Sequence, residues 1–197
     1  MNIVIIDYNA GNIRSVDFAL RRMGIVPEIT ADVNKINSAD KVIFPGVGEA
    51  STTMSFLKEK KLDVVIKELK QPVLGICLGL QLMCSHSEEN NVDCLNIFPV
   101  QVKRFDNSLD LSMKVPHMGW NALVDVKAPL LNNNQNNQYV YFVHSYYAEL
   151  SEYTIATCMY TQAFSAALNY KNFYAVQFHP EKSGNVGAEI LKNFINL

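Results

Sequence analysis

The chain has 197 residues, of which 49% are hydrophobic and 18% are charged. That amount of apolar material suffices for one substantial core but hardly for two, so we expect a single domain over residues 1–197. The 17 basic and 19 acidic residues leave a formal charge of −2, which gives no electrostatic reason to expect nucleic acid or an anionic membrane as a partner. No apolar run reaches the roughly 20 residues of a membrane-spanning helix and no leader-like segment opens the chain, so we expect a cytoplasmic protein.

The first half of the chain alternates apolar runs with segments of helical spacing. Runs rich in β-branched residues predict strands at 3–6, 26–29, 42–44 and 73–76. Apolar residues at helical spacing predict helices at 13–23, 56–69 and 78–83. This alternation favours an α/β fold with a parallel sheet covered by helices, in which the polar or glycine-rich loops after the strands gather at one sheet edge.

The second half has a different character. Short β-like runs predict strands at 100–104, 140–144, 155–160, 163–170 and 173–178, before a last helix at 186–194. These strands follow one another without intervening helices, so we expect mixed or antiparallel additions to the sheet. The asparagine-rich run 132–137 is expected to be a solvated loop.

Cys77 stands where a predicted strand meets a predicted helix, with Gly75 and Gly79 on either side. This is the pattern of a nucleophile elbow, a tight strand-to-helix turn that exposes a side chain. The positive end of the helix then faces the sulfur and favours the thiolate. We expect the small neighbours to let a substrate approach the backbone.

His179 and Glu181 supply what a nucleophilic cysteine needs. The histidine can take the thiol proton, and the carboxylate can hold the imidazole in one tautomer and stabilise its charged form. In an extended segment residues two apart face the same side, and Pro180 stiffens the link. A Cys-His-Glu triad with Cys77 is therefore predicted. The other cysteines lack metal-ligand spacing, and we expect neither a metal nor a cofactor.

Six segments carry a family pattern. Segments 45–48, 75–81 and 177–181 resemble the class I, or triad, glutamine amidotransferases. Segments 7–12, 114–121 and 142–147 narrow the resemblance to the glutaminase subunits of imidazole glycerol phosphate synthases, and the resemblance spans nearly the whole chain. The chain departs from that pattern at four positions where glycine is usual: Cys94, Asn96, Val100 and Ala175.

The resemblance implies a flavodoxin-like fold, with a central mostly parallel sheet flanked by helices and additional antiparallel strands in the second half. It also implies hydrolysis of the side-chain amide of L-glutamine. Cys77 would attack the amide carbon, and His179 would donate a proton to the departing ammonia and then activate water against the thioester. Glu181 would orient and stabilise the imidazolium.

The resemblance also implies how glutamine is held. Backbone N–H groups of Leu78 and of the loop with Val47 and Gly48 would form the oxyanion hole. Because glycine tolerates unusual backbone angles, we expect the Val47–Gly48 peptide to rotate, so that a partner could switch this hole on. The implied substrate-binding residues are Gly46, Gln81, Glu89 and the main chain of His144, Ser145 and Tyr146.

Ammonia would be lost as ammonium in water, so the resemblance implies a partner. That partner would be a (β/α)₈-barrel cyclase subunit in an expected heterodimer, which uses the ammonia to make imidazole glycerol phosphate and an aminoimidazole carboxamide ribonucleotide. We expect its contacts at the rim of the site, with aromatic side chains as anchors. The expected interface residues are Asn9, Asn12, His117, Trp120 and Asn121.

Other functions stay open at this point. A paralogous glutaminase could serve another synthase, such as one that amidates a nucleotide or a surface-sugar precursor. A cysteine peptidase or a chaperone-like protein of the same architecture would share the elbow cysteine, although the segment 178–181 would be an unusual source of its histidine. An inactive binding scaffold would conflict with an intact triad.

Overall fold

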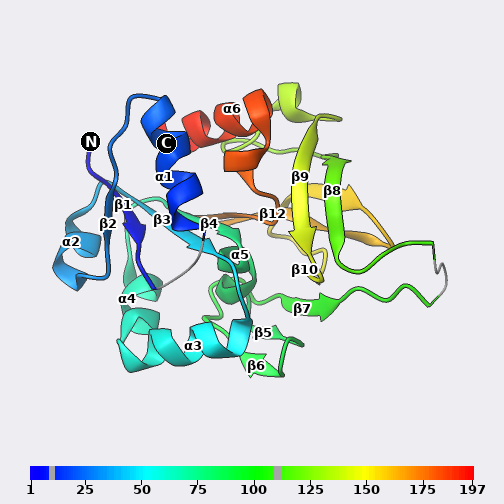
Figure 1. The fold of residues 1–197 in the computed structure, drawn as a ribbon, viewed down its shortest axis with the longest axis horizontal. Coiled ribbons are helices and arrows are strands. Elements are labelled where there is room, and N and C mark those ends of the chain that lie inside the picture. The colour runs from blue at the N-terminus through cyan, green and yellow to red at the C-terminus, as the bar shows by residue number, and fades with distance from the viewer. Residues whose placement is uncertain (9–11, 109–111) are drawn as a thin grey trace.

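A main β-sheet runs between two layers of helices in the computed structural model, which describes residues 1–8, 12–108 and 112–197 (Figure 1). The strands are β1 (Ile3–Ile6), β2 (Glu28–Thr30), β3 (Lys41–Gly46), β4 (Val73–Cys77), β5 (His86–Ser87), β6 (Val92–Asp93), β7 (Gln101–Arg104), β8 (His117–Ala122), β9 (Tyr139–His144), β10 (Tyr146–Ala148), β11 (Thr154–Met159), β12 (Ala163–Tyr170) and β13 (Phe173–Val176). The helices are α1 (Ile13–Arg22), α2 (Val33–Ser38), α3 (Ala50–Glu59), α4 (Leu62–Glu68), α5 (Leu78–Met83) and α6 (Gly184–Ile195), with 3₁₀ turns at Asn133–Gln135 and Pro180–Lys182.

The main sheet has the order β2-β1-β3-β4-β13-β12-β10-β7-β5-β6, with β11 also paired to β12. The neighbours from β2 to β13 pair in parallel, whereas β12 pairs antiparallel with β13, β10 and β11. The predicted α/β fold, with antiparallel strands added in the second half, is confirmed. The carboxyl ends of β3 and β4 lie side by side because Gly46 pairs with Cys77, and β13 runs parallel on the other side of β4.

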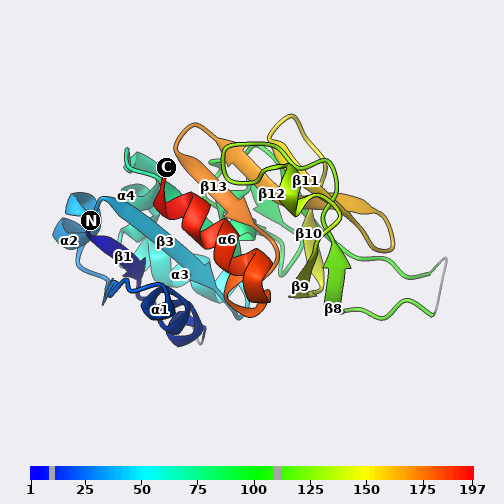
Figure 2. The same cartoon turned by 90° about the horizontal axis from the view of Figure 1, so that it is seen from above.

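The parallel strands β1, β3, β4 and β13 are buried on both faces, and their alternating side chains enter two separate cores. Ile5 lies in the same core as Leu20 of α1 and Phe194 of α6. Val4 lies in the opposite core with Ile66 of α4. Figure 2 shows α1 and α6 together over one face of the sheet. The sheet is thus rigidly held where its carboxyl edge carries the predicted chemistry.

The prediction of one helix at 56–69 is wrong. Helix α3 begins earlier, at Ala50, where the side chain of Glu49 accepts a hydrogen bond from the first turn. A second helix, α4, follows a break at Lys61, whose φ of 58° no helix can contain. The sequence offers no glycine or proline at this break. Helix α2, capped by the Asp32 side chain, and the short strands β5, β6 and β10 are also not predicted.

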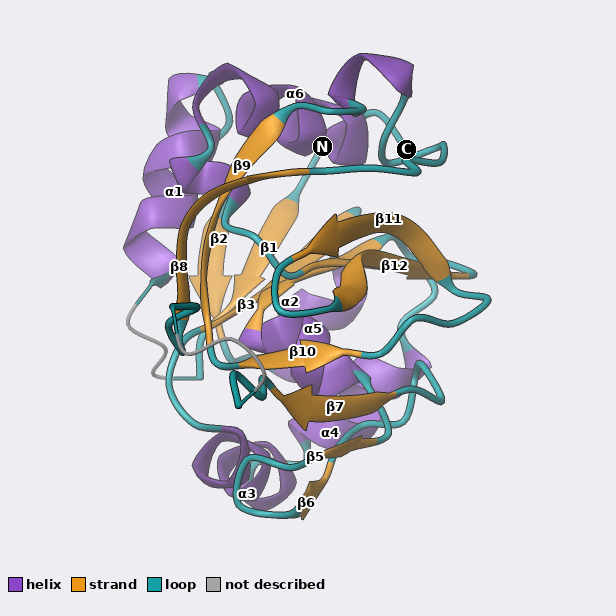
Figure 3. Cartoon of the chain, turned by 90° about the vertical axis from the view of Figure 1, so that its right-hand side faces the viewer, coloured by secondary structure: helices purple, strands orange, loops and turns teal. Residues whose placement is uncertain are grey.

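Strands β8 and β9 form a separate antiparallel pair, which Figure 3 shows beside the main sheet. His117 pairs with His144 in its register. No strand is predicted at β8 from the sequence, although most of β8 falls within the family motif of residues 114–121. None of the helices in the described ranges is long and apolar enough to cross a membrane.

Two departures from the family glycines fit the backbone. Asn96 has a φ of 53°, and asparagine tolerates this left-handed conformation better than most residues. Ala175 is fully buried in β13, where it pairs with Gly75.

Candidate active site

Cys77 ends β4 and lies directly before α5, as the elbow pattern predicts. Its backbone has a φ of 54° and a ψ of −108°, a strained conformation typical of a nucleophile at such a turn. Gly79 serves packing rather than substrate access, because a Cβ at this position would lie 2.0 Å from the carbonyl oxygen of Phe44 in β3. The glycine lets α5 lie close against β3 and so fixes the turn.

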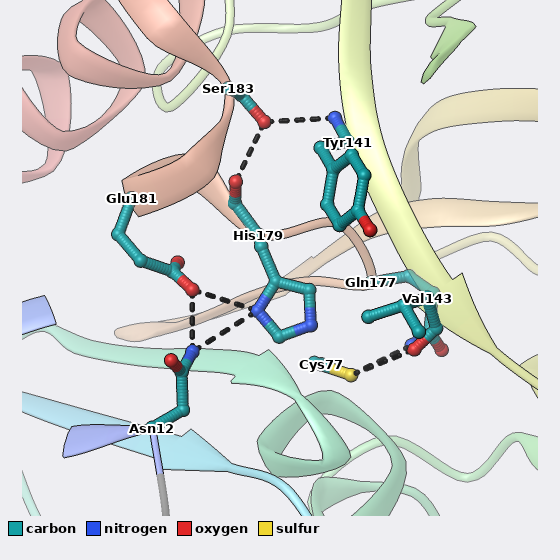
Figure 4. Close-up of polar contacts among 8 residues, drawn as sticks. All are labelled: Asn12, Cys77, Tyr141, Val143, Gln177, His179, Glu181 and Ser183. Carbon is teal, nitrogen blue, oxygen red and sulfur yellow. Dashed lines mark hydrogen bonds and ion pairs between the residues drawn. The ribbon is translucent and has the colours of Figure 1, made fainter. Parts of the chain in front are cut away.

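His179 is brought near Cys77 because β13 and β4 are parallel neighbours. Strand β9 holds the segment that follows β13 (Figure 4). The N–H of His179 donates to the carbonyl of Tyr141 at 2.9 Å. The hydroxyl of Ser183 donates to the carbonyl of His179 at 2.6 Å and accepts from the N–H of Tyr141 at 2.9 Å. The imidazole is therefore positioned from two strands.

Glu181 meets His179 as the spacing predicts, although through a 3₁₀ turn rather than an extended segment. Oε1 of Glu181 lies 2.8 Å from Nδ1 of the ring. The side-chain amide of Asn12 donates to the same carboxylate oxygen and lies 3.3 Å from Nδ1. Both side chains of the pair are buried, at 1% and 0% exposure. Two segments far apart in the sequence thus define this contact.

The electrostatics favour a charged imidazole. Nε2 of His179 points toward Cys77 (Figure 4) and is buried without a hydrogen-bond partner among the described residues. Burial alone would lower the pKa of His179, but the interactions with Cys77 and Glu181 outweigh it and raise the pKa to about 10. Burial also opposes ionisation of Glu181, yet His179 and then Asn12 lower the pKa of that carboxyl.

A cavity of about 370 Å³ opens beside Cys77, a size within the range of small-ligand sites. Every predicted catalytic, oxyanion-hole and substrate-binding residue lines it except Glu181, which lies behind the histidine, and Gly46. A Cβ at Gly46 would lie 2.6 Å from the backbone nitrogen of Gly79, so this glycine also serves close packing. The lining residues are Val47, Gly48, Cys77, Leu78, Gln81, Glu89, Pro116, Val143, His144, Ser145, Tyr146 and His179.

The cavity wall opposite the triad is held by side-chain hydrogen bonds. Gln81 is only 4% exposed, and its Nε2 donates to the carbonyl of Tyr146 at 2.9 Å. Nδ1 of His144 lies 2.7 Å from the same carbonyl. Glu89 accepts a hydrogen bond from the N–H of Ala50 at 2.8 Å, and its burial raises the pKa of the carboxyl. The two contacts to the Tyr146 carbonyl fix the main chain expected to hold the glutamine α-carboxylate.

The predicted interface residues divide into two groups. Asn12 and His117 are buried, at 7% and 3% exposure, which is not what an interface role predicts for their side chains. Trp120 is 55% exposed, and Asn121 donates to a carbonyl of β11 at 2.8 Å. Asn9 lies outside the described residues. The exposed face of β8 is therefore the part of the predicted interface that stands on the surface.

Three residues contact the site in ways not predicted from the sequence. Asn12 joins the His-Glu pair, and Nε2 of Gln177 lies 3.7 Å from Sγ of Cys77. The hydroxyl of Tyr8 donates to the carbonyl of Pro45, which fixes the end of β3. All three lie in or next to the family motifs, but no sequence signal tells which way their side chains point.

The fold and the arrangement of Cys77, His179 and Glu181 are those of a triad amidotransferase. The family described as glutamine amidotransferase class-I matches residues 4–197. The chain belongs to this family.

Curated relatives are similar over their whole length. A protein of Bacteroides fragilis (strain YCH46) named imidazole glycerol phosphate synthase subunit HisH is 58% identical, with 100% of both chains covered. A protein of the same name from Haemophilus influenzae (strain ATCC 51907 / DSM 11121 / KW20 / Rd) is 49% identical over 99% of this chain and 97% of its own length. A solved structure described as glutamine amidotransferase has a TM-score of 0.74 at 17% identity, covering 98% of this chain and 97% of that chain, which shows the shared fold.

Proposed function

We propose that this protein hydrolyses L-glutamine to glutamate and ammonia through Cys77, His179 and Glu181. The observation that carries the proposal is the meeting of these three side chains beside a cavity of about 370 Å³. Family membership supports glutamine as the substrate. It also disfavours the peptidase and chaperone readings of the same architecture.

The reaction proceeds in two acyl-transfer steps. The thiolate of Cys77 attacks the amide carbon, and the C–N bond breaks as His179 donates a proton from Nε2 to the leaving ammonia. His179 then takes a proton from water, which attacks the thioester and releases glutamate. The raised pKa of His179, to about 10, keeps the ring charged before the first step.

Negative charge develops on the amide oxygen in both steps. Leu78, Val47 and Gly48 line the cavity, and the backbone N–H groups of Leu78 and of the Val47–Gly48 segment are the proposed donors to this oxygen. Gly48 has a φ of 115°, which permits rotation of the preceding peptide. We propose that this peptide is the element through which a partner regulates turnover.

Substrate recognition uses the opposite wall of the cavity. The main chain of His144, Ser145 and Tyr146 holds the α-carboxylate, and Gln81 fixes this segment. Glu89 pairs with the α-ammonium group, whose positive charge favours the ionised carboxylate against the effect of burial.

The ammonia passes to a second subunit. The relatives' name, a synthase subunit, supports an assembly of this kind. We propose a (β/α)₈-barrel cyclase in a heterodimer that makes imidazole glycerol phosphate and an aminoimidazole carboxamide ribonucleotide. Trp120 on the exposed face of β8 is the proposed aromatic anchor.

The test is glutamate release by the purified chain, with and without such a cyclase and its phosphoribosyl ligand. Cys77→Ser is the control for the nucleophile. We expect strong stimulation by the cyclase, and no release from the Cys77→Ser chain in any condition. Release that depends on Cys77 but never responds to the cyclase would point to another synthase, whereas release that survives Cys77→Ser would refute the triad.

A further inference from the structure

Gln177 is a fully buried polar residue that the mechanism above does not use. It follows β13 directly, beside the end of β4 where Cys77 lies. Its side-chain Nε2 lies 3.7 Å from Sγ of Cys77, within hydrogen-bonding distance for sulfur (Figure 4). A neutral amide buried against a reactive thiol is a costly arrangement unless its hydrogen bonds are made.

The orientation of this amide is fixed by its neighbours. Nε2 of Gln81 donates to the carbonyl of Tyr146 at 2.9 Å, and a carbonyl can only accept. The same NH₂ group donates to Oε1 of Gln177 at 3.1 Å. The oxygen of Gln177 therefore faces Gln81, and its NH₂ group must face Cys77. The carbonyl of Tyr146 thus fixes the orientation of the Gln81 amide, and the Gln81 amide in turn fixes that of Gln177.

The hydrogen-bond partners of Sγ of Cys77 differ between its thiol and its thiolate form. As a thiol, Cys77 can donate toward the carbonyl of Val143, but at 3.9 Å this contact is long. As a thiolate, it accepts from the NH₂ group of Gln177, and Nε2 of His179 also faces it. Hydrogen bonds to an ionised acceptor are about twice as strong as neutral ones. The surroundings of the sulfur therefore favour its charged form.

We propose that Gln177 stabilises the thiolate of Cys77 by donating a hydrogen bond to Sγ, and that Gln81 aligns this donor from the wall that holds the substrate. The inference rests on the proposed glutaminase function and adds a further residue to it. It also links substrate binding to the nucleophile, because a shift of the Tyr146 carbonyl would release Gln81 and leave Gln177 able to turn.

The experiment measures the rate at which iodoacetamide alkylates Cys77 as a function of pH, without glutamine. Fragmentation in the mass spectrometer must assign the label to Cys77, because Cys84 and Cys94 share its tryptic peptide, residues 71–103, whereas Cys158 lies on another peptide. Gln177→Met keeps the size of the side chain but removes the donor. We expect the midpoint of the profile to move up by about one pH unit.

Gln135→Met is the matched control. Gln135 is also a buried amide, at 1% exposure, and its side chain donates at 2.9 Å to Glu189 of α6, and neither residue lines the cavity. The same chemical change there is expected to leave the alkylation profile of Cys77 at the wild-type position. Gln177→Glu is the second variant, which can still accept from Gln81 but places a carboxylate beside the sulfur, and it decides the matter if Gln177→Met does not fold.

Each outcome has one meaning. A wild-type profile in the folded Gln177 variants would overturn the role of Gln177, even if glutamate release still depends on Cys77. Glutamate release that survives Cys77→Ser would instead refute the glutaminase mechanism, whatever the alkylation profile. A shift in both Gln177 variants, absent from Gln135→Met, supports the inference.

Discussion

The buried pair His117 and His144 makes the stability of the fold depend on pH. The two side chains are only 3% and 6% exposed, with Nδ1 of His117 3.1 Å from Nε2 of His144. Burial lowers the pKa of His117 to about 4 and that of His144 to about 3. Both rings therefore stay neutral in the folded protein at pH values well below 6.5, the usual pKa of histidine.

The sign and size of the pH effect on stability follow from proton linkage. Below pH 6.5 an unfolded histidine binds a proton that the buried ring refuses, so stability is complete above this pH and is lost as the pH falls toward the folded pKa. Between about pH 7.5 and about pH 5 the loss is about 2 kcal/mol for each ring. His179 acts in the opposite direction, because its raised pKa gives stability that is complete below pH 6.5 and is lost as the pH rises through about 10.

His117→Phe isolates one ring of the pair. Phenylalanine can keep the stacking on Phe142 and Tyr160, whose ring centroids lie 4.8 and 4.0 Å away, but cannot bond His144. The variant is expected to be destabilised at pH 7.5, and the penalty should shrink by about 2 kcal/mol at pH 5 because a titrating group is gone. Urea unfolding followed by circular dichroism at both pH values measures this change.

The control variant is Tyr160→Phe. It removes the hydrogen bond from the Tyr160 hydroxyl to the carbonyl of Lys114, at 2.7 Å, without removing a group that titrates between these pH values. The loss of stability caused by Tyr160→Phe should be the same at pH 7.5 and at pH 5. An equal penalty of His117→Phe at the two pH values would refute the reasoning, because His117 would then titrate alike in the folded and unfolded chains.

Asn12→Ala removes a donor to Glu181, so kcat for glutamine is expected to fall about tenfold to a hundredfold with little change in KM, as steady-state glutamate release would measure; an unchanged kcat would exclude a role for this contact. Gly79→Ala places a Cβ 2.0 Å from the carbonyl oxygen of Phe44, so Tm should fall by several degrees or more, and an unchanged Tm would contradict the close packing of α5 on β3. At Gly48 a Cβ meets open space, but the φ of 115° is strained for alanine, so Gly48→Ala should lower cyclase-stimulated glutaminase activity, and full stimulation would exclude the rotating peptide.

Local sequence patterns predicted the parallel half of the fold well. Strand β1 and helix α5 have the predicted bounds, because strong apolar periodicity ends there in clear loops. The break between α3 and α4 was not predictable, since Lys61 takes a left-handed conformation that glycine or asparagine usually signals. Strand β8 was missed because its side chains pair with those of β9, and a single strand does not reveal its partner.

The candidate site likewise contains residues that could be predicted from the sequence and residues that could not. Cys77, His179 and Glu181 could be predicted because each stands in a recognisable local motif. The buried positions of Asn12 and His117 could not, because they depend on contacts with residues 169 and 27 positions away. Long-range packing decides whether a motif residue faces a partner protein or the interior.

The proposed site depends on one pairing that is remote in sequence. Strand β13 lies beside β4 although about 100 residues separate them, and this pairing brings both Gln177 and His179 to Cys77. Asn12 adds a third segment, from the start of α1. Loop closure over such separations is costly, so the contacts at the site can form only once the sheet has closed around β4. The contacts between Cys77 and its hydrogen-bond donors therefore depend on the complete sheet. Changes at buried positions such as Gly79 are for this reason expected to affect activity as well as stability.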